Sequence, residues 1–127
     1  MKKLPPLSEA QLEIMDVVWE RGQVTVGEVW KQLAERRKVA RNTVLTLMER
    51  LAKKGWLRRK ADGHVYRYTA AHPRDATLKQ LVGRLVDSAF RGSAEGLVMT
   101  LLNGRGITPE EANRIRQLID RARGTRK

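Results

Sequence analysis

Hydrophobic side chains recur every three or four residues along the first half of the chain, a spacing typical of helices with one buried face. Ser8 and Gln11 have the spacing of a capping box and predict a first helix over about residues 9–20. Thr25 and Glu28 repeat this spacing and predict a second helix. The side chains expected to face the core are Leu12, Met15, Val18 or Trp19 in the first helix, and Val26, Val29, Trp30 and Leu33 in the second.

A third helix is predicted over about residues 40–54, where Val44, Leu47, Met48 and Leu51 fall on one face. The opposite face holds cations, amide and hydroxyl groups, one acid, and one leucine expected to remain in water. These residues are Arg41, Asn42, Leu45, Thr46, Glu49, Arg50 and Lys53. Cations can bind phosphates, and amide and hydroxyl groups can bind base edges. The pattern therefore predicts a DNA recognition helix.

Two segments of alternating character follow the third helix and predict a β-hairpin. They span residues 56–60 and 65–69, and the Asp62-Gly63 dipeptide between them favours a tight turn within residues 61–64. A short edge strand is expected at Val24. Three helices followed by a hairpin is the order of a winged helix-turn-helix, mainly α with a small β wing. We expect residues 1–72 to form this DNA-binding domain.

The remaining residues, 73–127, are expected to form three helices with a broad apolar stripe. A segment of this size cannot bury the stripe alone, and each apolar side chain gains about 1.5–3 kcal/mol from burial. We therefore predict a three-helix dimerisation domain. Two copies related by a two-fold axis would place two recognition helices about one DNA turn apart, or a multiple of it. The stripe contains Leu78, Leu81, Val82, Leu85, Val86, Leu97, Val98, Leu101, Ile115, Leu118 and Ile119.

Composition narrows the possible partners. The formal net charge of +12 on 127 residues favours nucleic acid, acidic protein or an anionic membrane surface. The chain has no cysteine and two histidines, which predicts no metal site and no cofactor. No apolar run approaches the roughly 20 residues of a membrane span, so a soluble cytoplasmic protein is expected. No nucleophile has a plausible base, and an enzyme is not expected. The three tryptophans are expected to fill the core.

The expected DNA contacts divide into those that read bases and those that bind phosphate. Asn42, Thr43 and Thr46 are the candidates for base contacts, although Thr43 is equally suited to hydrogen-bonding its own helix. The candidates for phosphate contacts are Arg41, Arg50 and Lys53 on the third helix, and Arg58, Arg59, Lys60 and Arg67 on the wing. At least one wing cation should point away, because strand side chains alternate. His64 is either a contact to phosphate or sugar, or simply a turn residue.

Several motifs resemble the penicillinase-repressor family of BlaI, MecI and CopY type. They are the segment from Leu7 to Met15, the run Asn42-Thr43-Val44-Leu45-Thr46-Leu47, the run Lys53-Lys54-Gly55, and the wing tyrosines Tyr66 and Tyr68. The resemblance covers nearly the whole chain. It implies a dimeric transcriptional repressor with an N-terminal winged helix on a palindromic operator and a C-terminal dimerisation segment of three helices.

Two departures from this resemblance change the expected details. Leu45 stands where the resemblance implies an arginine that reaches bases, and leucine can contact a thymine methyl group but cannot donate to guanine. A different operator is therefore expected. Thr100-Leu101 stands where the resemblance implies an Asn-Phe bond cleaved on induction, which leaves this cleavage region and a sensor protease as open alternatives. The cysteine motif of the copper-responsive branch is absent.

Two functions remain to be distinguished. The favoured one is a sequence-specific repressor that binds a palindromic operator as a homodimer. The alternative is a winged-helix module that binds an acidic protein or structured RNA. Such a module would need neither two-fold symmetry nor a fixed half-site spacing, so the oligomeric state discriminates between the two.

Overall fold

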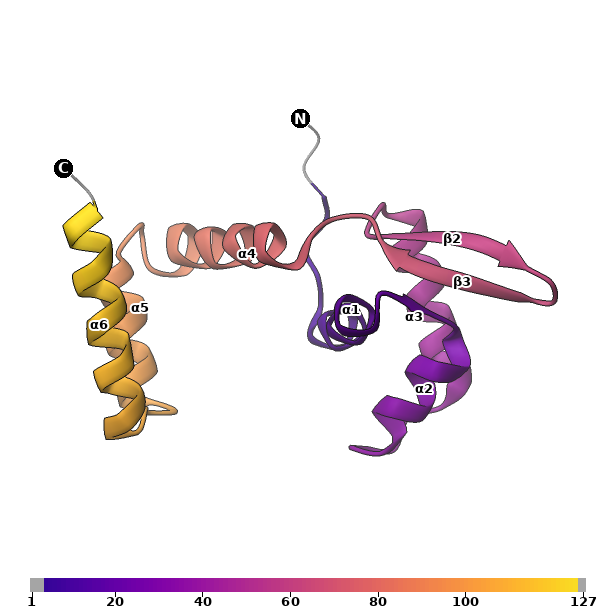
Figure 1. The fold of residues 1–127 in the computed structure, drawn as a ribbon, viewed down its shortest axis with the longest axis horizontal. Coiled ribbons are helices and arrows are strands. Elements are labelled where there is room, and N and C mark those ends of the chain that lie inside the picture. Colours follow the sequence, from indigo (N-terminus) through magenta and orange to yellow (C-terminus); the bar gives the residue numbers. More distant parts are fainter. Residues whose placement is uncertain (1–3, 126–127) are drawn as a thin grey trace. The chain divides into compact units, whose positions relative to one another are not determined.

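A computed structural model describes residues 4–125, and its helices and strands are drawn in Figure 1. The chain divides into a first compact unit that ends at Leu81 and a second that begins at Val82. The predicted fold class is confirmed, since helices predominate and a small antiparallel sheet accompanies them. Among the described residues, no helix is long and apolar enough to span a bilayer.

The first unit contains the three predicted helices, α1 (Glu9–Arg21), α2 (Val26–Ala34) and α3 (Arg41–Lys53). Both predicted capping boxes are present. The Gln11 amide donates to Ser8 Oγ at 3.1 Å, and the Ser8 amide donates to Gln11 Oε1 at 2.9 Å. The corresponding distances between Thr25 and Glu28 are 3.2 and 2.8 Å. These reciprocal bonds satisfy backbone donors that a helix start otherwise leaves unpaired.

A three-stranded antiparallel sheet of order β1-β3-β2 completes the first unit. Its strands are β1 (Gln23–Val24), β2 (Leu57–Asp62) and β3 (Val65–Ala70), and β1 is the expected edge strand. The hairpin of β2 and β3, here called the wing (57–70), projects beyond the helices in Figure 1.

The wing turn differs from the prediction. Asp62 was expected within the turn, but it pairs with Val65 as the last residue of β2, so Gly63 and His64 alone form the connection. Gly63 has a φ of 63° and is the residue of the two with a positive φ, as in a type II′ turn. The Asp-Gly pattern located the hairpin but placed its turn one residue too early.

The core of the first unit lies where the three helices meet the sheet. The predicted Met15, Val18, Val29 and Leu33 are fully or almost fully buried. Ile14 and Val17 are also buried although the predicted stripe omitted them. Because α1 packs against α2, α3 and β3 together, it buries a wider face than a single stripe. The core is completed by Val24, Val26, Val44, Met48, Leu51, Trp56, Leu57 and Tyr68.

Each tryptophan packs against or within this core and uses its indole N–H to hold a chain segment. Trp19 Nε1 donates to the His72 carbonyl at 2.9 Å, and Trp30 Nε1 donates to the Val39 carbonyl at 2.9 Å. Trp56 Nε1 donates to the Pro5 carbonyl at 3.0 Å. The predicted role as core filler is confirmed for Trp56, which is buried, whereas Trp19 and Trp30 are half-buried.

Three further helices follow, as predicted: α4 (Arg74–Ala89), within which the two units divide, α5 (Ala94–Asn103) and α6 (Pro109–Thr125). Thr108 accepts a hydrogen bond from the Glu111 amide at 3.1 Å and so opens α6. Between Val82 and Gly124, no described side chain is buried. Of the predicted dimerisation residues, Leu78, Leu81, Val86, Leu97 and Ile115 are half-buried. The others, Val82, Leu85, Val98, Leu101, Leu118 and Ile119, are exposed.

Candidate nucleic-acid interface

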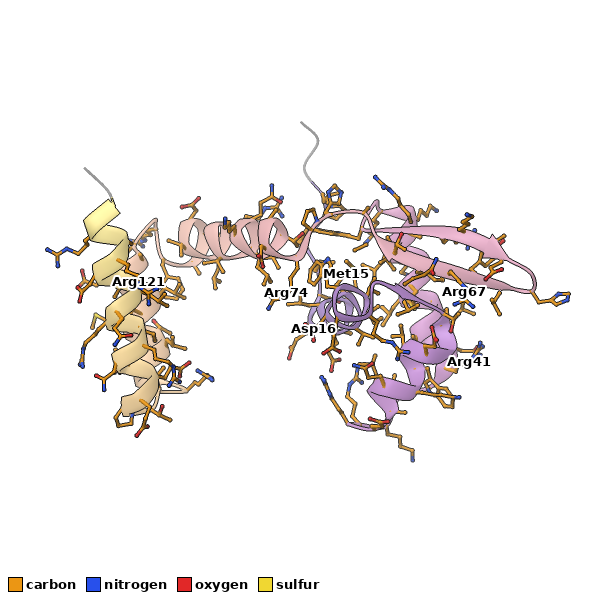
Figure 2. All side chains as sticks on the ribbon, in the orientation of Figure 1. Met15, Asp16, Arg41, Arg67, Arg74 and Arg121 are labelled. Carbon is orange, nitrogen blue, oxygen red and sulfur yellow. The ribbon has the colours of Figure 1, made fainter. Side chains whose placement is uncertain are left out.

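One face of α3 is free of the core. Val44, Met48 and Leu51 are fully buried and fix the orientation of the helix. The opposite face carries exposed cations, amide and hydroxyl groups, and the single acid Glu49. Its exposed candidate contact residues are Arg41, Asn42, Thr43, Thr46, Arg50 and Lys53. Arg41, labelled in Figure 2, marks the start of this helix. The geometry thus brings the cations and the candidate base-reading side chains onto one surface.

Thr43 does not cap α3. The N-cap residue is Ala40, α3 has no side-chain cap hydrogen bond, and the Thr43 side chain is exposed. At the other end Gly55 has a φ of 95°, the left-handed conformation expected after a helix. The Thr43 hydroxyl is therefore exposed and available to an external partner.

Leu45 is half-buried, so the expectation that it remains in water is wrong. It packs against the core and borders a hollow of about 240 Å³ together with Arg41, Tyr66 and Tyr68. The helical periodicity of α3 could not reveal this, because the hollow is bordered by residues of α2 and β3, which are distant from Leu45 in the sequence. Its remaining exposed part lies between α3 and the wing.

The wing has two distinct faces, which follow from its register. Arg59 pairs with Tyr68, whose ring is buried in the core, so Arg59 lies on the face that turns toward the helices. The other three wing cations, Arg58, Lys60 and Arg67, lie on the opposite face. The register therefore places wing cations on both faces of the hairpin, and which of them points away from DNA stays a prediction. His64 is exposed at the turn.

Arg67, labelled in Figure 2, is paired within the wing rather than free. Its Nε lies 2.6 Å from Asp62 Oδ2 in an ion pair whose side chains are 36% and 59% exposed. The hydrogen bond and the charge of Asp62 raise the pKa of Arg67. Since arginine is already protonated at neutral pH, the consequence is a neutralised cation, not a change of protonation.

Arg59 is held differently. Its guanidinium carbon lies 4.2 Å from the centroid of the Tyr66 ring, and both side chains are exposed. Sequence reasoning did not identify Asp62 or Tyr66 as partners of wing cations. The alternation of side chains along the hairpin could have predicted both pairs, but only with the turn placed at residues 63–64. Once the register is set, each pair falls on one face as diagonal neighbours.

The possible cleavage region lies in the second unit. Thr100 and Leu101, the possible cleavage region, are exposed and lie within the helical backbone of α5. Within the part of the chain that the structure describes, no group of three or more His, Cys, Asp and Glu side chains is placed to hold a metal ion.

Comparison with known proteins gives a consistent set of relatives. A family model described as penicillinase repressor matches residues 7–121. A penicillinase repressor of Bacillus licheniformis is 28% identical over 127 residues, covering 100% of this chain and 99% of the relative. A transcriptional regulator BlaI of Mycobacterium tuberculosis is 31% identical over 121 residues, covering 94% of this chain and 86% of the relative.

The solved structures include a relative with the same kind of description. The monomeric form of BlaI from Bacillus licheniformis, solved in complex with the blaP half-operator, is 36% identical to this chain with a TM-score of 0.51. The match covers 59% of this chain and 92% of that one. The family model spans most of the chain, and sequence and structural relatives carry related descriptions. This chain therefore belongs to the penicillinase repressor family.

Proposed function

We infer that this chain is a DNA-binding transcriptional repressor. The observation that carries the inference is the exposed face of α3, which presents cations and base-compatible polar groups beside a basic wing. Its relatives are named as repressors and as a transcriptional regulator, and one of them was solved on a half-operator. That relative matches over a winged-helix unit of the same kind.

The proposed mechanism combines electrostatic capture with side-chain readout. Arg41, Arg50 and Lys53 bind phosphates and set the register on the duplex, since phosphate contacts position a protein without reading sequence. Asn42, Thr43 and Thr46 read base edges in the major groove. The exposed part of Leu45 contacts a thymine methyl group. Arg58, Arg59, Lys60 and His64 contact the backbone from the wing, whereas Arg67 contributes less because Asp62 neutralises it.

Repression by a homodimer on a palindromic operator is the second part of the proposal. Residues 1–72 bind DNA and residues 73–127 dimerise. The support is that large apolar side chains on α4, α5 and α6 remain exposed in a single copy, among them Leu85 at 46% and Leu118 at 59%. Exposed apolar patches of this kind mark association surfaces. Such a repressor acts where the chromosome lies, and we propose the cytoplasm as its location.

The cleavage region that the resemblance implies lies in α5. Cleavage at Thr100-Leu101 by a sensor protease requires the helical backbone of α5 to open locally. An alternative function as a module for an acidic protein or structured RNA is not favoured, because the relatives are repressors. They are not described as enzymes either.

The proposal is tested by selecting bound duplexes from a random pool with the full chain, and then measuring affinity for the recovered site against salt. We expect one palindromic consensus and a steep linear fall of log K with log salt, as release of counterions from DNA requires. Recovery of no consensus together with equal affinity for structured RNA would overturn the proposed function. Light scattering that shows only monomers at the concentration of binding would overturn the dimeric part alone.

A further inference from the structure

Arg59 and Tyr66 are diagonal neighbours on the wing face that turns toward α3. The register pairs Arg59 with Tyr68 and Ala61 with Tyr66, which places all four side chains on one face. Leu57 and Tyr68 on this face are buried against the helices, with 3% and 1% of their surfaces exposed. Farther along the hairpin the same face leaves the core and becomes accessible to an external partner.

The contact between Arg59 and Tyr66 orders a cation without cancelling its charge. The guanidinium carbon stands 4.2 Å above the ring, a distance typical of a cation–π interaction. Tyr66 is 48% exposed, so about half of its surface remains accessible. An arginine that is already held in place loses less conformational freedom when it binds a ligand than a free one does.

The other wing cations are arranged differently. Arg67 is neutralised by Asp62 at 2.6 Å. Arg58 and Lys60 form no ion pair with any residue between positions 4 and 125 and lie on the opposite face. Arg59 is therefore the wing cation that combines an ordered position, a full charge and a location facing α3.

The surroundings of Arg59 are suited to an anion. Arg59 borders a hollow of about 780 Å³ between α3 and β2, to which Lys53 and Arg58 also contribute and in which Glu49 is the acidic member. Cationic side chains of both α3 and β2 therefore border this hollow. We propose that Tyr66 is a positioning residue that holds Arg59 ready to bind a backbone phosphate of the DNA strand lying between α3 and the wing. This inference rests on the proposed function in DNA binding.

The test uses the full chain and a fluorescently labelled mixed-sequence duplex, because a phosphate contact is independent of sequence. Affinity is measured over a series of salt concentrations for Tyr66→Leu, Tyr66→Phe, Arg59→Gln and the Tyr66→Leu/Arg59→Gln double variant. Lys60→Gln, with and without Tyr66→Leu, is the matched control, since it removes the same charge from the opposite face and Lys60 does not border the hollow. The thermal midpoint of each variant is recorded to verify folding.

We expect Tyr66→Leu to weaken binding about two- to fivefold, the range for an exposed cation–π contact, while the salt slope stays unchanged because the charge remains. Tyr66→Phe keeps the ring and binds like the wild type. Arg59→Gln lowers the salt slope by about 0.9, as loss of one phosphate contact requires. Tyr66→Leu has no further effect in the Arg59→Gln background and keeps its full effect in the Lys60→Gln background.

Each opposing outcome has a distinct meaning. An equal effect of Tyr66→Leu in both backgrounds would show that the ring acts through packing, and a loss in Tyr66→Phe would show that the hydroxyl itself binds; either result overturns the inference. If Tyr66→Leu lowers the thermal midpoint, Arg59→Lys replaces it, because lysine keeps the charge but stacks less well. Wild-type affinity in Arg59→Lys then overturns the positioning role. Failure of the wild type to bind any duplex would instead overturn the proposed function.

Discussion

Trp19 and His72 are joined across 53 positions of sequence by a hydrogen bond of 2.9 Å from the indole Nε1 to the backbone carbonyl. The bond ties α1 to the segment that follows the wing. Replacing Trp19 by phenylalanine keeps an aromatic ring and removes the donor. We expect a loss of about 0.5–1 kcal/mol in the free energy of unfolding, the lower part of the usual range, because water can reach the exposed carbonyl.

Urea unfolding monitored by circular dichroism measures this loss. Tyr66→Phe is a suitable control, because it also removes one polar group from an aromatic ring and Tyr66 is exposed on the wing. An unchanged unfolding midpoint in Trp19→Phe would mean that the indole N–H contributes nothing beyond what water supplies.

The capping box of α2 makes part of the stability dependent on pH. The Glu28 carboxylate accepts a hydrogen bond from the Thr25 amide, which is the main reason why its pKa lies below the usual 4.5, with Arg21 and Arg67 also lowering it. A carboxyl group whose pKa is lowered by folding stabilises the protein above its unfolded pKa, and this contribution is lost as the pH falls through the folded value. Glu28→Gln should therefore be less stable than the wild type at neutral pH, and the difference should disappear in acid.

Urea unfolding at pH 7 and at an acid pH where Glu28 is protonated in the folded state tests this expectation. The box of α1 provides the matched control, because Gln11 occupies the same position without a charge. Gln11→Ala should destabilise the protein to a similar extent at both pH values. A Glu28→Gln defect of the same size at both pH values would assign the effect to geometry and not to charge.

Residues Arg50 and Lys53 should control the salt dependence of DNA binding. Both are exposed in the last turns of α3 and are proposed to bind phosphate. The double replacement by alanine should lower the slope of log K against log salt by about 1.8, because each phosphate contact contributes about 0.9. An unchanged slope, measured by anisotropy titration, would remove both residues from the interface.

Leu45→Arg should change which operator is preferred more than how tightly DNA is bound. The arginine stem can replace the half-buried leucine against the core while its head reaches the groove. An arginine can pair with guanine where leucine meets only a methyl group. Selection from a random duplex pool is the measurement, and recovery of the wild-type site by the variant would contradict the proposed contact.

Leu85→Glu should weaken self-association and operator binding together. The side chain is 46% exposed on α4, and a charge there must be desolvated if the helix packs against a second copy. Gln117→Glu on α6 adds the same charge at an exposed polar position outside the stripe and serves as the control. Sedimentation and anisotropy measure the two effects. Full operator affinity in a monomeric Leu85→Glu variant would exclude dimerisation from the mechanism.

The local elements of this fold were accessible from the sequence, because their signals lie within a few residues of each other. Ser8 with Gln11 and Thr25 with Glu28 mark helix starts through bonds that span three positions. The cationic face of α3 followed from its buried stripe in the same way. These features need no knowledge of which elements meet in the folded chain.

The features that were not accessible depend on register or on distant elements. Leu45 packs against the core and borders a hollow shared with residues of α2 and β3, so helical periodicity alone left it in water. The pairing of Asp62 with Arg67 and of Arg59 with Tyr66 depends on a turn that starts at Gly63, one residue later than the Asp-Gly pattern suggested. A one-residue error there exchanges the two faces of the strand.

The three indole donors give the protein its own optical reporters. Trp19, Trp30 and Trp56 bind carbonyls in three different places, namely before α4, between α2 and α3, and in the N-terminal segment. The emission of each ring depends on whether its own segment is closed over it. Three variants that each retain one of these tryptophans would therefore show, by their changes in fluorescence, which attachment is altered when the protein binds its target.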